Sequence, residues 1–155
     1  MVGKVLITGI LCLTLLLQAC SNSELSGEDQ IKETIESGIK AAENRDASDL
    51  ADLIDENYLD DKGLNKAQLT KLLRLYFFRH KNIFLFTKIE EIEFLTENRA
   101  LVSLNVAMAG SVISDANALS SLRARIYNFE LELVKEDEWL LQRATWRDAS
   151  MGDML

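Results

Sequence analysis

The spacing of the apolar residues changes once along the chain, near position 82, and this change limits the fold more than any other feature. Upstream of it, apolar residues recur every three or four positions, as in Ile31, Ile35 and Ile39, which is the period of one helix face. Downstream they alternate with polar residues, as around Phe129 and Leu131, which is the period of a strand with one wet face. The chain is therefore predicted to be an α+β protein, with helices first and an antiparallel sheet after them.

Three helices are expected in the first part of the chain. The first covers residues 28–44 and has Ser26 and Asp29 at its start, a pair typical of an N-terminal cap. Asp46 can cap a second, shorter helix, and Asn65 can cap a third helix that ends at basic residues. Beyond these helices, a longer polar insertion separates the second of four strand segments from the third. The segments lie at about 83–95, 99–109, 122–134 and 139–147.

Composition excludes one class of partner. The chain has 155 residues, of which 48% are apolar and 27% charged, which is typical of a folded domain. Its net charge is −8, and a surface of that sign repels phosphate backbones. Binding to DNA or RNA is therefore not expected.

The N-terminal segment has the pattern of a secretion signal. Lys4 supplies one positive charge, and a nearly unbroken apolar run of about 13 residues follows it. That run is shorter than the roughly 20 residues that cross a bilayer as a helix. The stretch Leu17-Gln18-Ala19-Cys20 then resembles the lipobox of bacterial lipoprotein precursors.

This resemblance implies that residues 1–19 are a signal peptide, removed before Cys20, and that Cys20 carries a diacylglyceryl thioether and an acylated amino group. Several acyl chains anchor a protein stably. Ser21 resembles the residue of lipoproteins that are released to the outer membrane, so we expect an envelope protein facing the periplasm. Residues 20–27 form a short polar tether. The alternatives are an ordinary signal peptide with an incidental cysteine, or an uncleaved anchor.

The order of elements in the rest of the chain is similar to the nuclear transport factor 2-like superfamily, the cone-shaped fold of ketosteroid isomerase and scytalone dehydratase. The similarity covers residues 28–148, followed by a C-terminal tail at 149–155. It implies three helices on a curved four-stranded antiparallel sheet, a pocket between them, and dimers formed through the sheet. A different α+β sandwich is the alternative. The matching segments are Glu43-Asn44-Arg45-Asp46, Tyr58-Leu59-Asp60-Asp61-Lys62-Gly63 and the hairpin from Trp139-Leu140-Leu141 to Ala144-Thr145-Trp146.

The catalytic residues of ketosteroid isomerase are matched only in part. The position of its helix-borne tyrosine falls near Gly38, which has no side chain to donate a hydrogen bond. Asp60 or Asp61 lies near the position of its base. The alternative is that these acids terminate or cap helices around a loop, and this interpretation is the one we favour.

Other chemistry has little support in the sequence. Cys12 lies inside the signal peptide, and the sulfur of Cys20 is expected to be acylated, which leaves no thiol for a disulfide, a metal site or catalysis. His80 is the one histidine and is expected at the end of a helix, so a two-histidine metal site is excluded. We expect no metal and no cofactor.

Five residues are candidates for a ligand site at the mouth of the cone. An arginine there can hold a carboxylate, and tyrosine and tryptophan offer rings with polar tips. The alternatives are ordinary core packing for the aromatic residues and an ion pair between Arg125 and Asp61. The candidates are Tyr58, Tyr76, Arg125, Tyr127 and Trp146.

The leading hypothesis is a lipid-anchored envelope protein without catalytic activity that binds a small ligand or a partner protein. One alternative is a small isomerase or dehydratase with Asp60 or Asp61 as its base, which requires a buried carboxylate. Another is a structural subunit of an envelope complex that uses its sheet as the interface.

Overall fold

The computed structural model describes residues 25–112 and 124–154. The lipobox and Cys20 lie outside the described residues, so the expectations about the signal peptide and its acylation stay predictions. Within the described part, the chain runs through three α-helices, four strands and a short 3₁₀ helix. The prediction of helices followed by an antiparallel sheet is confirmed.

The three helices begin at the residues that the capping patterns indicate. Helix α2 covers Gly27–Asn44, α3 covers Ala47–Asp52 and α4 covers Lys66–Arg79. The Oγ of Ser26 accepts the N–H of Asp29 at 3.2 Å. The Oδ1 of Asp46 accepts two amides at the start of α3, and Asn65 forms a capping box at the start of α4. These bonds satisfy N–H groups that a helix cannot satisfy internally.

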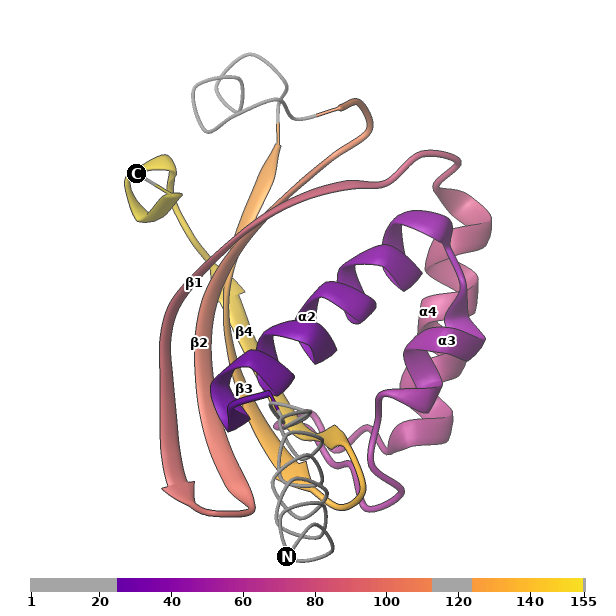
Figure 1. The fold of residues 1–155 in the computed structure, drawn as a ribbon. Helices are drawn as coiled ribbons and strands as arrows, with labels where there is room; N and C mark the ends of the chain where they lie inside the picture. The colour runs from indigo at the N-terminus through magenta and orange to yellow at the C-terminus, as the bar shows by residue number, and fades with distance from the viewer. Residues whose placement is uncertain (1–24, 113–123, 155) are drawn as a thin grey trace, which may run out of the picture.

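The sheet is an antiparallel meander with strand order β1-β2-β3-β4. Strand β1 covers Phe84–Thr96 and β2 covers Arg99–Ala109. Strand β3 covers Arg125–Lys135 and β4 covers Trp139–Asp148. The pairing of β1 with β2 shifts after Ile89, and that of β3 with β4 shifts after Glu132. Such bulges increase the local twist, and the sheet curves around the helices (Figure 1).

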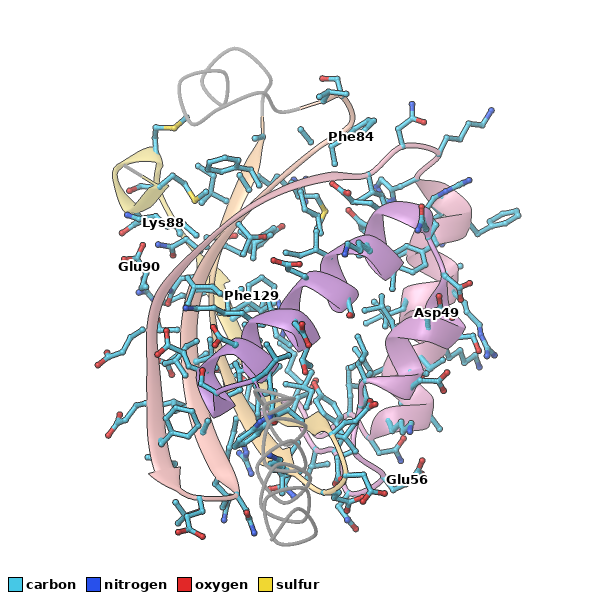
Figure 2. All side chains as sticks on the ribbon, in the orientation of Figure 1. Asp49, Glu56, Phe84, Lys88, Glu90 and Phe129 are labelled. Carbon is cyan, nitrogen blue, oxygen red and sulfur yellow. The ribbon has the colours of Figure 1, made fainter. Side chains whose placement is uncertain are left out.

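The concave face of the sheet carries the main core. Ile31 and Ile35 of α2 pack against alternate residues of β2, among them Val102 and Leu104. In Figure 2, Phe129 lies between the sheet and the helices, whereas Lys88 and Glu90 lie on the outer side. Helix α2 packs on strands and on α3, while α3 also packs on α4. Phe77 of α4 shares a hydrophobic cluster with Leu85 of β1 and Met108 of β2. Side chains of both α2 and α4 therefore cover the concave face.

The outer face of the sheet is covered at one end by the 3₁₀ helix η3, which covers Met151–Met154 within the expected C-terminal tail. Met154 is buried against Ala107 and Ile126. The side chain of Asn105 connects this helix to the sheet. Its Nδ2 donates to the carbonyl oxygen of Asp153 at 2.6 Å and to Glu90 Oε1 at 3.0 Å. Its Oδ1 accepts a hydrogen bond from Asn128 at 3.0 Å.

We expect Asn105→Ala to lower the free energy of unfolding by about 1–3 kcal/mol, because it leaves buried polar groups without partners. Urea unfolding measures this loss. Ser103→Ala is the matched control, since Ser103 lies on the same face two residues away. It should change the free energy by less than about 0.5 kcal/mol. Equal losses in the two variants would contradict the role given to Asn105.

Candidate functional site

A row of aromatic rings crosses the upper part of the concave face. Tyr127 and Phe129 alternate along β3, and Trp146 is the residue of β4 paired with Phe129. The centroids of Tyr127 and Phe129 are 6.3 Å apart with the rings edge to face, and those of Phe129 and Trp146 are 6.1 Å apart with the rings stacked. All three side chains are half-buried. Rings in such a row present apolar surface of a kind that ligand rings stack on.

A cationic side chain lies at each end of this aromatic row. The Nζ of Lys62 is 3.9 Å from the ring centroid of Trp146, within the range of a cation–π interaction. At the other end, Arg125 lies beside Tyr127 on the same face of β3, and the interaction with this side chain raises the pKa of the guanidinium. Asp148 also lies close enough to act on Arg125. The row therefore runs between two positively charged side chains, both of them exposed.

Tyr76 approaches the Arg125 end of the row from α4. Its hydroxyl donates to the Sδ of Met108 at 2.8 Å, and its ring stacks on that of His80 with centroids 4.0 Å apart. Burial raises the pKa of Tyr76, and the neighbouring Tyr127 adds to the effect. His80 ends α4, and its Nδ1 lies 2.9 Å from the carbonyl oxygen of Tyr76. The histidine thus lies at the helix end, where the sequence analysis expected it.

Tyr58 lies beneath the Trp146 end of the row. Its side chain is 2% exposed and packs with Ile54 and Ala144. The hydroxyl has no hydrogen-bond partner among the described residues. Burial raises the pKa of Tyr58 to about 12, and the charges of Asp60 and Asp61 add to the shift.

The two adjacent acids have different environments. Asp60 is 3% exposed, and its Oδ1 accepts the N–H groups of Lys62 at 2.9 Å and Leu64 at 2.8 Å. Its Oδ2 is buried without a partner in the described structure. Asp61 is exposed, which removes it as a buried base. One oxygen of Asp60 thus holds the loop before α4, in agreement with the interpretation that these acids terminate or cap helices. The other oxygen has no partner among the described residues.

The five predicted ligand residues are neighbours in the structure. Tyr76 and Arg125 lie near Tyr127. Phe129 contacts both Tyr127 and Trp146, and Tyr58 packs near Trp146. The expected alternative of an Arg125–Asp61 ion pair is absent from the part of the chain that the structure describes. Phe129 and Lys62 were not among the candidates. The alternation of strand β3 could have identified Phe129, because it shares a face with Tyr127. Lys62 lies in a loop, and no periodicity places its ammonium over a distant tryptophan.

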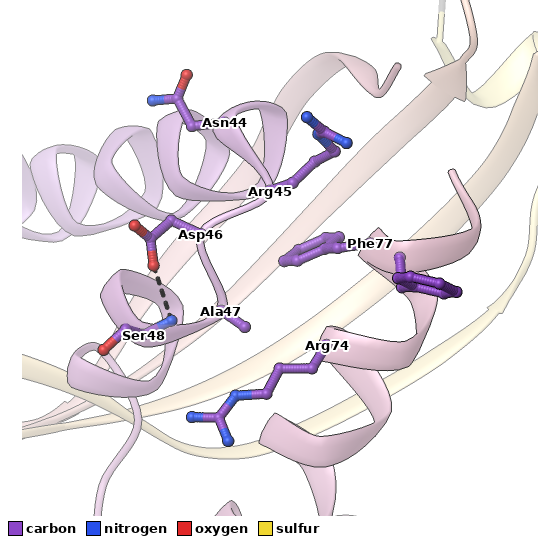
Figure 3. Close-up of a pocket in the computed structure, with 8 residues that line it drawn as sticks. Asn44, Arg45, Asp46, Ala47, Ser48, Arg74 and Phe77 are labelled. Atoms are coloured by element: carbon purple, nitrogen blue, oxygen red, sulfur yellow. Dashed lines mark hydrogen bonds between the residues drawn. The ribbon is translucent and has the colours of Figure 1, made fainter. Parts of the chain in front are cut away.

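Two surface grooves lie away from the concave row. One, of about 510 Å³, lies where α2 ends and α3 begins, beside α4 (Figure 3). The other, of about 520 Å³, lies between the start of α2 and the β3–β4 hairpin. In the described ranges, no group of three or more His, Cys, Asp or Glu side chains is arranged to hold a metal ion. None of the described helices has the length and apolarity needed to span a bilayer.

Similarity to known proteins is found in structure and not in sequence. No family profile and no curated protein sequence matches the chain. A candidate scytalone dehydratase of Novosphingobium aromaticivorans aligns with a TM-score of 0.66 at 17% identity, over 79% of this chain and 84% of that one. A nuclear transport factor 2-like protein of unknown function from Shewanella oneidensis aligns with a TM-score of 0.56 at 16% identity, over 77% and 97% of the two chains. The fold is nuclear transport factor 2-like.

A third neighbour shows the same fold inside a longer protein. A Bdellovibrio bacteriovorus protein aligns with a TM-score of 0.63 at 14% identity, over 78% of this chain, and this chain spans 41% of its length. At such identities the likeness shows the fold alone, and activity has to be argued from side chains. In this nuclear transport factor 2-like domain those side chains are the aromatic row, its two cations and the buried pair Tyr58 and Asp60.

We expect the stability of the protein to fall between pH 10 and pH 12, partly because of Tyr58. The unfolded chain loses this proton near pH 10, whereas the folded protein holds it until about pH 12. The unfolded state is then favoured as the pH rises, by up to about 3 kcal/mol. Tyr58→Phe should remove this part of the loss, and at pH 8 it should raise the free energy of unfolding by about 1–3 kcal/mol, because it deletes a buried hydroxyl that has no partner among the described residues.

Urea unfolding at pH 8 and pH 11 tests this expectation. Phe77→Leu, which only reduces packing at another buried ring, should lower the free energy of unfolding equally at both pH values. The idea fails if Tyr58→Phe and wild type lose the same free energy between the two pH values.

Proposed function

We propose that this protein is a lipid-anchored binding protein of the bacterial envelope, and that its concave face holds a small ligand with a ring and an acidic group. One observation carries the proposal: the half-buried row Tyr127–Phe129–Trp146, with Lys62 at one end and Arg125 at the other. Aromatic rings in a filled core need no cations at their ends. A ring-containing anion is the kind of ligand that such an arrangement fits.

The rings supply the apolar part of the binding energy. Phe129 stacks on Trp146 and meets Tyr127 edge to face, so their remaining exposed surfaces face the same side of the sheet. A planar ligand that covers them removes apolar surface from water, at roughly 25 cal/mol for each Å². A row of three rings suits an elongated or fused-ring ligand better than a compact one.

The cations supply selectivity for charge. A guanidinium forms hydrogen bonds with a carboxylate that are roughly twice as strong as bonds between neutral groups. Arg125 is exposed, so its donors remain open to water beyond the interaction with Tyr127. Asp148 partly offsets its charge, and the proposal therefore requires a ligand acid that binds in preference to that carboxylate.

The proposed anchor depends on the segment before α2. The lipobox ends at Cys20, and α2 begins at Gly27, so only the six residues 21–26 separate the acylated residue from the first helix. As a flexible chain they span roughly 15 Å. We therefore place the domain at the membrane surface, on the periplasmic side of the outer membrane.

A second candidate function is an isomerase or dehydratase with Asp60 as its base. It is favoured by the free Oδ2 of Asp60 and the free hydroxyl of Tyr58, a buried acceptor and a buried donor in one region. The structural neighbour named for scytalone dehydratase makes this chemistry worth testing. Catalysis by Asp60 requires that a ligand atom reach its Oδ2. A structure of the domain with a bound ring carboxylate would decide whether a ligand atom lies there.

A third candidate, an accessory subunit that docks through its sheet, has less support. Helix η3 covers the upper outer face, and the lower outer face carries charged side chains such as Glu93, Glu130 and Arg143. Interfaces between stable partners have cores depleted in charge. The same argument applies to a homodimer formed through the sheet.

We expect 2-naphthoate to bind the concave row and to quench the fluorescence of Trp146. The amide 2-naphthamide has the same rings without the charge and should bind on the order of tenfold more weakly at low salt. Arg125→Gln should abolish the difference between the two compounds. Fluorescence titration of wild type and variant measures it.

Arg143→Gln is the matched control, because Arg143 is an exposed arginine on the other face of the sheet. It should leave both affinities unchanged. Failure of both compounds to bind at millimolar concentration, or an equal effect of the two arginine variants, would contradict the proposed site.

We also expect mass spectrometry of the protein extracted from its native membrane to find Cys20 at the amino terminus, carrying acyl chains. Cys20→Ala should be neither acylated nor retained in the membrane fraction, because the sulfur is the acceptor of the lipid. Ser21→Ala, at the next position, should keep both properties. An unmodified Cys20 in membrane-bound protein would refute the anchor.

A further inference from the structure

Helix α4 has apolar residues on both of its sides, and one of those sides is exposed. Leu69, Leu73 and Phe77 face the interior. On the outer side, Leu72 is 48% exposed, Leu75 is 46% exposed and Phe78 is 87% exposed. Their three-residue spacing places them in one row along the helix. An apolar row that stays exposed on the outer side of a helix is a surface that a partner is expected to cover.

The same surface is basic in an acidic protein. Residues 63–89 contain no Asp or Glu and six of the 17 basic residues, although the net charge of the chain is −8. Lys71, Arg74 and Arg79 are exposed on α4 among the apolar row. We call this surface, made of Leu72, Leu75, Phe78, Lys71, Arg74 and Arg79, the basic apolar face.

A groove beside the basic apolar face adds a further guanidinium. Arg45 ends α2 in the left-handed conformation, with φ 59°, and lines the groove together with Arg74 (Figure 3). Phe78 lies at the same groove. One acid, Asp46, also lines it, and the Oδ1 of this carboxylate accepts two amides at the start of α3. The exposed Asp49 lies on the neighbouring helix α3. The groove thus combines two guanidinium groups with an exposed ring.

We propose that the basic apolar face lies on an anionic phospholipid membrane. Leu72, Leu75 and Phe78 enter the headgroup region, and the basic side chains contact phosphate groups, two of which Arg45 and Arg74 hold at the groove. Interfacial helices combine Leu and Phe with Lys and Arg in this way. Each basic residue near an anionic surface strengthens binding by about 1 kcal/mol, or roughly fivefold. An acidic protein would also complement the charge of the basic apolar face, and it is the alternative occupant.

The membrane is favoured because it is already within reach. This step rests on the anchor in the proposed function: the six residues between Cys20 and Gly27 let these two positions lie at most about 25 Å apart. That length keeps the domain at the bilayer and leaves it free to turn. Docking through α4 would fix the orientation of the domain at the bilayer.

The test places a fluorescent probe on the basic apolar face of the lipidated protein. Since the mature chain has no other cysteine than Cys20, Leu75→Cys can be labelled selectively with a nitrobenzoxadiazole dye. The protein is reconstituted in vesicles of phosphatidylcholine with or without 30% phosphatidylglycerol, together with spin-labelled lipid. With phosphatidylglycerol, lipid quenching of this probe should exceed that of a probe at Glu93→Cys by about twofold or more. It should fall at high salt.

Charge reversals give the decisive comparison. The double variant Lys71→Glu with Arg74→Glu should lower the fraction of docked protein on the order of tenfold, and the quenching should fall with it. Lys40→Glu with Arg143→Glu, which makes the same change in net charge away from α4, should leave it intact. Equal effects of the two pairs, or equal quenching in vesicles without phosphatidylglycerol, would overturn the proposal.

The experiment separates docking from anchoring. Retention of the protein on the vesicles reports the anchor, and quenching of the probe reports the docking. Retained protein whose probe stays in water would overturn docking alone and make an acidic protein the better occupant. Quenching in a preparation that lacks the acyl chains would support docking independently of the anchor.

Discussion

The packing of α2 against the concave face is the contact on which the rest of the structure depends. Ile31 and Ile35 meet the alternate apolar residues of β2, and Leu133 and Trp139 close the same cluster from the hairpin. Burying such side chains contributes about 1.5–3 kcal/mol each. Farther along the sheet, Phe129 packs against this cluster and Trp146 against a second one around Tyr58, yet both rings stay half-buried. The proposed site is therefore the partly exposed border of the core.

Much of this arrangement follows from local sequence. The caps at Ser26, Asp46 and Asn65 mark where each helix begins, since they satisfy N–H groups that the helix cannot satisfy internally. The alternation along β3 places Tyr127 on the face that holds the core. Such features depend on neighbours within a few residues, and period and capping chemistry describe them completely.

The remaining features depend on contacts between distant segments, which no local pattern encodes. The pairing of Phe129 with Trp146 requires the register of β3 against β4, and a bulge after Glu132 shifts that register. Lys62 reaches the Trp146 ring from a loop that precedes α4. The last residues were expected to be a tail, yet Met154 is buried against the outer face. That contact depends on a buried Asn105, which a strand pattern alone marks only as an outward polar residue.

The buried polar atoms near Tyr58 give the clearest link between stability and function. A hydroxyl or carboxylate oxygen that is buried without a partner costs about 1–3 kcal/mol, and a hydrophobic core gains nothing from keeping it. Tyr58 and Asp60 each leave such an atom free in the described structure, within one segment and beneath the aromatic row. A phenylalanine in place of Tyr58 would fill the same space without that cost. Its hydroxyl therefore lowers the stability of the described structure, and it is the group through which the proposed ligand site can be tested.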